Sequence, residues 1–176
     1  MSIRTKSDVP NRPLETELEQ LFRQHSQMLY RTAYSLLDNA ADSEDVLQNI
    51  FLRLLRNGLP PDLKRNAKGY FYRAAVNVSL DTIRSRKRRE VRNLPQTTSA
   101  PPTDTEMVEE THRRLAEGLA ELDPQAAQIL ILKYVHRYKE SDIARLLGIS
   151  RGAIAMRLLR SRFRLKQLMQ ESGEQR

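Results

Sequence analysis

Two clusters of arginine and lysine dominate the charge of this chain of 176 residues. Residues 84–92 hold six basic side chains against one acid, a net of +5, and residues 151–166 hold six against none, a net of +6. The formal net charge of the whole chain is +8, so the remainder of the chain is slightly acidic. Guanidinium and ammonium groups bind phosphates, and a clustered basic surface attracts polyanions. The clusters therefore indicate two surfaces for nucleic acid, an anionic membrane or an acidic protein.

The sequence lacks the residues or residue patterns needed for disulfides, metal binding and the common kinds of enzyme catalysis. The absence of cysteine excludes disulfides, Cys-ligated zinc and thiol nucleophiles, and it is typical of a reducing cytoplasm. The three histidines, His25, His112 and His136, are scattered, and the sequence contains no glycine-rich phosphate loop or metal-ligand cluster. We therefore expect no enzyme activity, cofactor, metal or small-molecule substrate. The longest aliphatic run, residues 129–132, is too short to cross a bilayer, so we expect a cytoplasmic protein without membrane insertion.

The elements that must position the basic clusters are all predicted to be helices. Apolar residues recur at helical spacing, and no segment shows sustained strand alternation. Residues 93–106 instead combine prolines with threonine and serine, and such a stretch buries too little apolar surface to fold. The predicted fold is all-α, with two small helical domains joined by a flexible linker. Its parts are a flexible tail (1–13), the first domain (14–92), the linker (93–106) and the second domain (107–171).

Two helix starts are marked by acidic residues. Asp42 and its neighbours begin an amphipathic helix, because carboxylates favour the positive end of a helix dipole. Its apolar stripe ends before Asn57-Gly58, and the polar stretch from there through Pro60-Pro61 to Lys68 is predicted to be a loop. Asp123-Pro124 predicts another helix start, with the aspartate as N-cap and the proline at the first helical position.

The strongest local pattern lies between Lys139 and Leu165. Gly148 can adopt the left-handed conformation that ends a helix, and Ser150 can cap the next one. In the second helix Ile154 and Leu158 are predicted to pack inward, which leaves arginines facing out: Arg151, Arg157 and Arg160. This pattern predicts a helix-turn-helix whose second helix enters a DNA major groove.

Three segments follow one another in a characteristic order: residues 42–53, residues 70–84 and residues 122–165. In this order they resemble bacterial RNA polymerase sigma factors of the sigma-70 family, extracytoplasmic-function (ECF) type. Residues 42–53 (DSEDVLQNIFLR) resemble sigma region 2.2, and Leu122-Asp123-Pro124 through Leu165 resembles region 4. Two further segments, both within residues 70–84, resemble regions 2.3 and 2.4: Tyr70-Phe71-Tyr72-Arg73-Ala74-Ala75-Val76-Asn77 and Asp81-Thr82-Ile83-Arg84. The resemblance covers residues 18–92 and 110–169, and it implies a sigma region 2-like bundle followed by a region 4-like helix-turn-helix domain.

The resemblance also implies the partners. Region 2.2 would bind a coiled coil of the largest subunit of core RNA polymerase through Asp45, Gln48, Phe51 and Leu52, with Asn49 standing where the family commonly has an acid. The polymerase flap and an anti-sigma factor are further implied partners. The function implied is that of a factor that binds core polymerase and directs promoter recognition, promoter opening and transcription initiation.

Promoter DNA would be contacted at two elements. The first domain would capture an unstacked base of the minus-ten element, which requires a basic track with aromatic or amide groups. The residues assigned to this element are Tyr70, Arg73, Asn77, Arg84, Lys87 and Arg88. The second domain would read the minus-thirty-five duplex through Arg151, Arg157, Arg160 and Arg164. Ala155 and Met156 depart from the basic and hydroxyl residues that the family often has there, so upstream preference should differ from that of better-known members.

Two alternative functions remain at this point. A helix-turn-helix transcriptional regulator with an N-terminal helical interaction domain accounts for residues 139–166, but not for the other basic cluster or for the helix that begins at Asp42. A membrane-surface role for residues 84–92 leaves the helix-turn-helix unexplained. Binding of a palindromic duplex by a dimer of the chain alone would distinguish the regulator.

Overall fold

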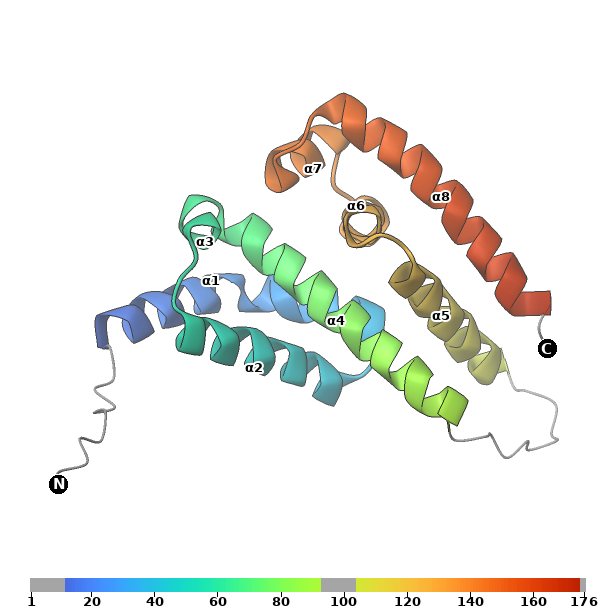
Figure 1. Ribbon diagram of the computed structural model, residues 1–176, viewed down its shortest axis with the longest axis horizontal. Coiled ribbons are helices and arrows are strands. Elements are labelled where there is room, and N and C mark those ends of the chain that lie inside the picture. Colours follow the sequence, from blue (N-terminus) through green and yellow to red (C-terminus); the bar gives the residue numbers. More distant parts are fainter. Residues whose placement is uncertain (1–11, 93–103, 175–176) are drawn as a thin grey trace, which may run out of the picture.

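The computed structural model describes residues 12–92 and 104–174. Within these ranges all regular structure is helical, which confirms the predicted all-α class. The helices are α1 (Arg12–Leu37), α2 (Ala40–Asn57), α3 (Pro61–Arg65), α4 (Ala67–Arg92), α5 (Asp104–Glu121), α6 (Pro124–Tyr134), α7 (Glu140–Leu147) and α8 (Arg151–Glu174) (Figure 1). No helix in the described part of the chain is both long and apolar enough to cross a membrane.

Local capping explains where several helices begin and end. Asp123 accepts hydrogen bonds from the backbone N–H groups of Gln125 and Ala126, so the predicted start of α6 is confirmed. Gly148 has φ 70° and ends α7, and the Ser150 hydroxyl accepts from the Ala153 N–H at 3.2 Å. The predicted helix-turn-helix of α7 and α8 is therefore present, with both of its turn residues in the expected roles.

The expected loop after α2 is wrong in part, because it contains α3 and the start of α4. Pro61 occupies the first turn of α3, where the missing N–H of proline has no cost, and Leu63 is fully buried and anchors the helix to the core. Two other boundaries shift by a few residues. α1 begins at Arg12, and α5 begins at Asp104, where acidic side chains in the first turn favour the helix dipole. The expected tail (1–13) and linker (93–106) otherwise lie outside the described residues.

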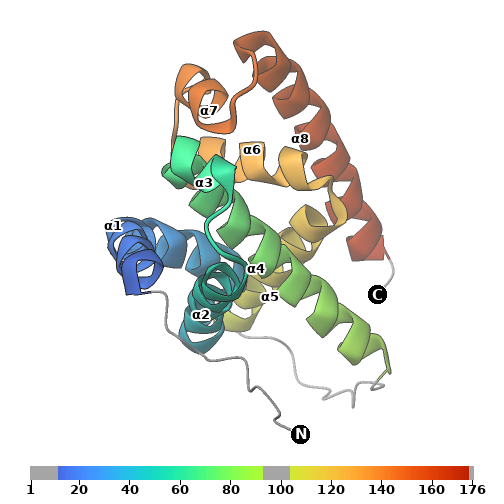
Figure 2. The same ribbon diagram turned by 60° about the vertical axis from the view of Figure 1, so that its left-hand side comes forward.

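The two groups of helices, α1–α4 and α5–α8, pack against each other. α4 contacts α1 and α2 on one side and α5 and α6 on the other (Figures 1 and 2). The buried side chains of both groups form one continuous apolar cluster that includes Phe71 and Tyr72 of α4 and Ile129 and Ile131 of α6. The two domains that the sequence predicts therefore pack directly on each other. We call this packing of α1–α4 against α5–α8 the closed arrangement.

Candidate nucleic-acid interface

The outer face of α2 carries the residues expected to bind polymerase. Helical spacing places Asp45, Gln48 and Leu52 opposite the buried stripe, and all three are exposed, Leu52 by 41%. Phe51 lies at the edge of this face, half-buried, with its ring edge-on to Phe22 at 5.2 Å between centroids. A shallow groove of about 320 Å³ runs along this face and is lined by Phe22, Leu47, Gln48, Phe51 and Leu52, with Asp45 outside it. Phe51 therefore packs on the core as well as lining the groove.

The residues expected at the minus-ten element follow one side of α4. Tyr70 is half-buried, with its ring edge-on to that of Phe71 at 6.1 Å, and Arg73 is also half-buried. Asn77 lies one turn beyond Arg73 and is exposed. The basic residues Arg84, Lys87 and Arg88 continue this side toward the end of the helix. The structure thus brings an aromatic ring, an amide and a run of cations onto one track, as capture of an unpaired strand requires.

In the closed arrangement α5 and α6 occupy part of this track. The Asn77 Oδ1 accepts a hydrogen bond from Gln128 Nε2 at 3.0 Å. Arg84 Nε donates to the Ala120 carbonyl at 2.8 Å, and Lys87 Nζ donates to Glu121 Oε1 at 3.1 Å. Sequence reasoning missed these contacts, because they join residues more than thirty positions apart and leave no local signal.

The turn into α4 makes a close approach to the second group of helices. Asn66 accepts from the Gly69 N–H through Oδ1 and donates from Nδ2 to the Leu146 carbonyl, both at 2.9 Å. A Cβ on Gly69 would lie 2.5 Å from the Leu146 carbonyl oxygen, so only glycine fits here. This contact was also not predicted.

The arginines expected to read the minus-thirty-five element lie on α8, and they differ in how far their side chains are exposed. Ile154 and Leu158 are buried as predicted. Arg151, Arg160 and Arg164 are exposed, and Arg164 pairs with Glu171 at 3.8 Å.

The expectation that Arg157 faces out is wrong, because this side chain is half-buried. Its Nη1 is buried without a hydrogen-bond partner among the described residues. Position 157 lies between 154 and 161 at helical spacing, and both of those are buried, so Arg157 sits at the edge of the inward stripe.

An apolar groove that the sequence did not reveal lies between α5, α6 and α8. It encloses about 900 Å³, and its walls include Leu115, Tyr134, Leu159 and Phe163, of which Leu159 and Phe163 are each 65% exposed. Basic side chains line it as well: Arg114, Arg162 and Lys166. Contiguous exposed apolar surface of this kind is typical of an interaction site. The pattern could not be read from one helix, because each contributes only a few residues.

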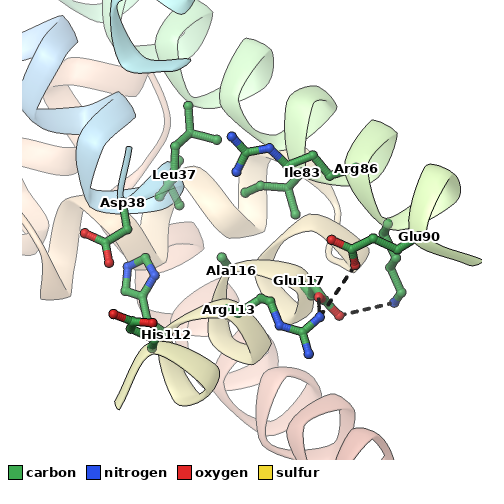
Figure 3. Close-up of a pocket in the computed structure, with 12 residues that line it drawn as sticks. Leu37, Asp38, Ile83, Arg86, Glu90, His112, Arg113, Ala116 and Glu117 are labelled. Atoms are coloured by element: carbon green, nitrogen blue, oxygen red, sulfur yellow. Dashed lines mark hydrogen bonds and ion pairs between the residues drawn. The ribbon is translucent and has the colours of Figure 1, made fainter. Parts of the chain in front are cut away.

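A smaller cavity of about 380 Å³ lies where the end of α1 meets α4 and α5 (Figure 3). Arg113 is the centre of its charge network and pairs with Glu110 at 2.7 Å, Glu117 at 2.9 Å and Glu90 at 3.6 Å. Burial alone would lower the pKa of Arg113, but the Glu110 hydrogen bond and the surrounding carboxylates raise it. No cluster of metal-ligating side chains occurs among the described residues. The ion pairs of Arg113 with Glu90 and of Lys87 with Glu121 tie α5 to α4.

Comparison with known proteins identifies both halves of the chain. Residues 21–89 match the family Sigma-70 region 2, and residues 112–165 match the family Sigma-70, region 4. The ECF RNA polymerase sigma factor SigL of Mycobacterium tuberculosis is 29% identical over 157 residues, which cover 87% of this chain and 89% of that protein. SigE of Mycolicibacterium smegmatis, also an ECF sigma factor, is 27% identical over 154 residues, or 84% of this chain, which spans only 60% of that protein's length.

Among solved structures, the sigma factor RpoE in complex with the anti-sigma factor NepR from Bartonella quintana aligns over 90% of this chain and 98% of that one, with 19% identity and a TM-score of 0.45. The two sequence matches cover most of the chain and fall in the order expected from the sequence, with region 2 on α1–α4 and region 4 on α5–α8. The chain therefore belongs to the sigma-70 family of bacterial RNA polymerase sigma factors and, within it, to the ECF type.

Proposed function

We propose that this chain is a sigma factor that binds core RNA polymerase in the cytoplasm, recognises promoter DNA and directs its opening for transcription initiation. The observation that carries the proposal is that one chain displays three different surfaces on three helices: the groove of α2, the track of α4 and the exposed arginines of α8. A helix-turn-helix regulator uses only the third of these, so the regulator is not favoured.

The α2 groove is the proposed contact with the coiled coil of the largest polymerase subunit. It offers an exposed apolar side chain, Leu52, with the amide of Gln48 beside it and the carboxylate of Asp45 one turn away. Such a surface suits a partner helix that presents apolar residues with a basic rim.

The track on α4 is the proposed contact with the minus-ten element. In this proposal Tyr70 provides an aromatic surface for an unstacked base, Arg73 and Asn77 provide hydrogen bonds to it, and the cations that follow hold phosphates. The residues that serve the phosphates are Arg84, Lys87 and Arg88.

The apolar groove between α5, α6 and α8 is the proposed contact with the polymerase flap. Its exposed Leu159 and Phe163 can receive apolar side chains, and its basic rim can pair with acids on the same partner. The family resemblance also implies an anti-sigma factor, which could silence the chain by covering this groove or the face of α2.

Two exposed arginines of α8 give a test of upstream recognition. We expect Arg160→Ala to flatten discrimination among single-base variants of the minus-thirty-five duplex, with a cost of about 1–3 kcal/mol at one position. Arg164 lies later on the helix, where its side chain would contact the DNA phosphate backbone. Arg164→Ala should therefore weaken binding to all duplexes alike and reduce the salt slope of the affinity by about 1. Affinities of both variants for a panel of duplexes at two salt concentrations distinguish the roles. A uniform loss for Arg160→Ala would mean that α8 reads no base through this residue.

The proposal as a whole is tested by transcription. Core polymerase mixed with the chain is expected to initiate at promoter DNA that neither component transcribes alone, and failure to initiate on any template would reject it.

A further inference from the structure

Buried and partly buried polar contacts hold α1–α4 against α5–α8. The Tyr72 hydroxyl donates to the Gln128 carbonyl at 2.6 Å, and both residues are buried, by 100% and 96% of their surface. Burial raises the pKa of Tyr72 well above its usual value, so its hydroxyl stays a donor. With the contacts of Asn66 to Leu146 and of Arg84 to Ala120, these bonds extend along α4. Separating the two groups would break these hydrogen bonds, each of which makes a small net contribution to stability, so the contacts favour the closed state.

The closed state occupies residues that the proposed function assigns to DNA. Asn77 bonds to Gln128 and Lys87 to Glu121, so neither is free for an unpaired strand. α4 therefore has to lose its contacts with α5 and α6 before its whole track can bind the minus-ten element. This step rests on the proposed function, whereas the closure itself does not.

His136 lies within the same interface, in the turn between α6 and α7. Its Nε2 is 3.0 Å from the Thr32 Oγ1 of α1, and its ring is edge-on to Tyr72 and Tyr138 at 5.8 and 6.2 Å between centroids. The Thr32 hydroxyl already donates its proton to the Met28 carbonyl at 2.8 Å. Thr32 Oγ1 therefore accepts from His136, which places the proton of the neutral imidazole on Nε2.

The charged groups that act on His136 across the interface are both cations: Arg31 of α1 and Lys68 of α4. Lys68 Nζ also lies 5.3 Å from the centre of the Tyr138 ring. Burial first, and then these two cations, lower the pKa of His136 below its ordinary value of 6.5. A second proton would put an imidazolium beside two positive charges in a site from which water is partly excluded.

We propose that His136 makes this closed arrangement pH-sensitive and that protonation of its imidazole opens it. In the open form the imidazole meets water and regains its ordinary affinity for protons, so the open form binds protons more readily than the closed form. Closure is then fully favoured above pH 6.5 and is weakened as the pH falls below that value, by up to about tenfold per pH unit until His136 also titrates in the closed form.

The test measures closure in the full chain. The sequence has no cysteine, so Asn49→Cys on α2 and Gln170→Cys on α8, both at exposed positions, can carry a dye pair for energy transfer. Transfer is expected to be high at pH 7.5 and to fall toward pH 5.5. His136→Gln, which cannot gain the charge, should remain closed over this range.

The matched control is His25→Asn. His25 also has a lowered pKa, from burial and from Lys68, but its ring packs on Phe71, which lies within α1–α4. This variant should open with acid as the unmodified chain does, and circular dichroism checks that the helices persist. Equal pH dependence with and without His136, or high transfer at every pH, would overturn the proposal.

Arg31→Gln is a second test of the same effect, for the case that His136→Gln does not form the closed arrangement at any pH. It leaves the groups that touch the imidazole in place and removes one of the two cations, so opening by acid should weaken. Unchanged opening in Arg31→Gln would contradict the role of His136. Binding of a minus-ten single strand, measured in parallel, separates this proposal from the proposed function: opening without a gain in strand binding would retain the switch and reject the role of α4.

Discussion

Leu52→Glu is expected to weaken binding of this chain to core RNA polymerase by about a hundredfold while leaving its fold intact. Leu52 is 41% exposed in the isolated chain and lines the α2 groove, so the substitution removes little from the core. In the complex it would bury a carboxylate without a partner, which costs about 3 kcal/mol or a hundredfold in affinity. Competition with unmodified chain for a limiting amount of core polymerase measures the effect.

Two other substitutions on α2 serve as controls for this result. Arg53→Glu makes an acidic change at the neighbouring exposed position, which faces away from the groove, and should retain polymerase binding. Phe51→Ala should lower the free energy of unfolding by about 2 kcal/mol, because it loses the contact with Phe22. Equal binding by Leu52→Glu and the unmodified chain would remove α2 from the polymerase interface.

The second large effect is expected from the double variant Arg73→Ala, Asn77→Ala. If these side chains hold a flipped base, promoter opening should fall about a hundredfold, since each contact of this kind contributes about 1–3 kcal/mol. Initial binding to duplex promoter should change little, because α8 provides it. Permanganate footprinting of the bubble measures opening, and filter binding at low temperature measures the closed complex.

Gln128→Leu is the matched control for this variant. It removes the amide that contacts Asn77 in the closed state but leaves every assigned DNA-binding group on α4. Opening should therefore persist in Gln128→Leu and fail in the double variant. Normal opening by the double variant would contradict the assignment of the minus-ten element to α4.

Features set by neighbouring residues could be predicted from the sequence. The Asp123 cap, the left-handed Gly148 and the Ser150 cap each depend on a few adjacent backbone groups, and all three are present. The buried stripe of α2 likewise follows from helical spacing alone, and so does the exposure of Gln48 and Leu52 opposite it.

Features set by distant residues could not be predicted. The Tyr72–Gln128 bond joins residues 56 positions apart, and neither residue type signals a partner. The short helix α3 was missed because two prolines and polar neighbours outweigh its single buried anchor, Leu63, in any local pattern. The error at Arg157 is of another kind: helical spacing places it between the buried positions 154 and 161, and its charge, which usually favours exposure, led to the outward assignment.

The central claim, that this chain directs polymerase to promoters, is tested most directly by promoter selection. Core RNA polymerase is incubated with a library of randomised duplex templates, with and without the chain, and the transcripts are sequenced. The account predicts transcripts only when the chain is present, from templates enriched for two short elements at a fixed spacing. In Arg160→Ala the enrichment should be lost at one position of the upstream element. Absence of chain-dependent transcripts, together with binding of a palindromic duplex by the chain alone as a dimer, would contradict it and favour a helix-turn-helix regulator.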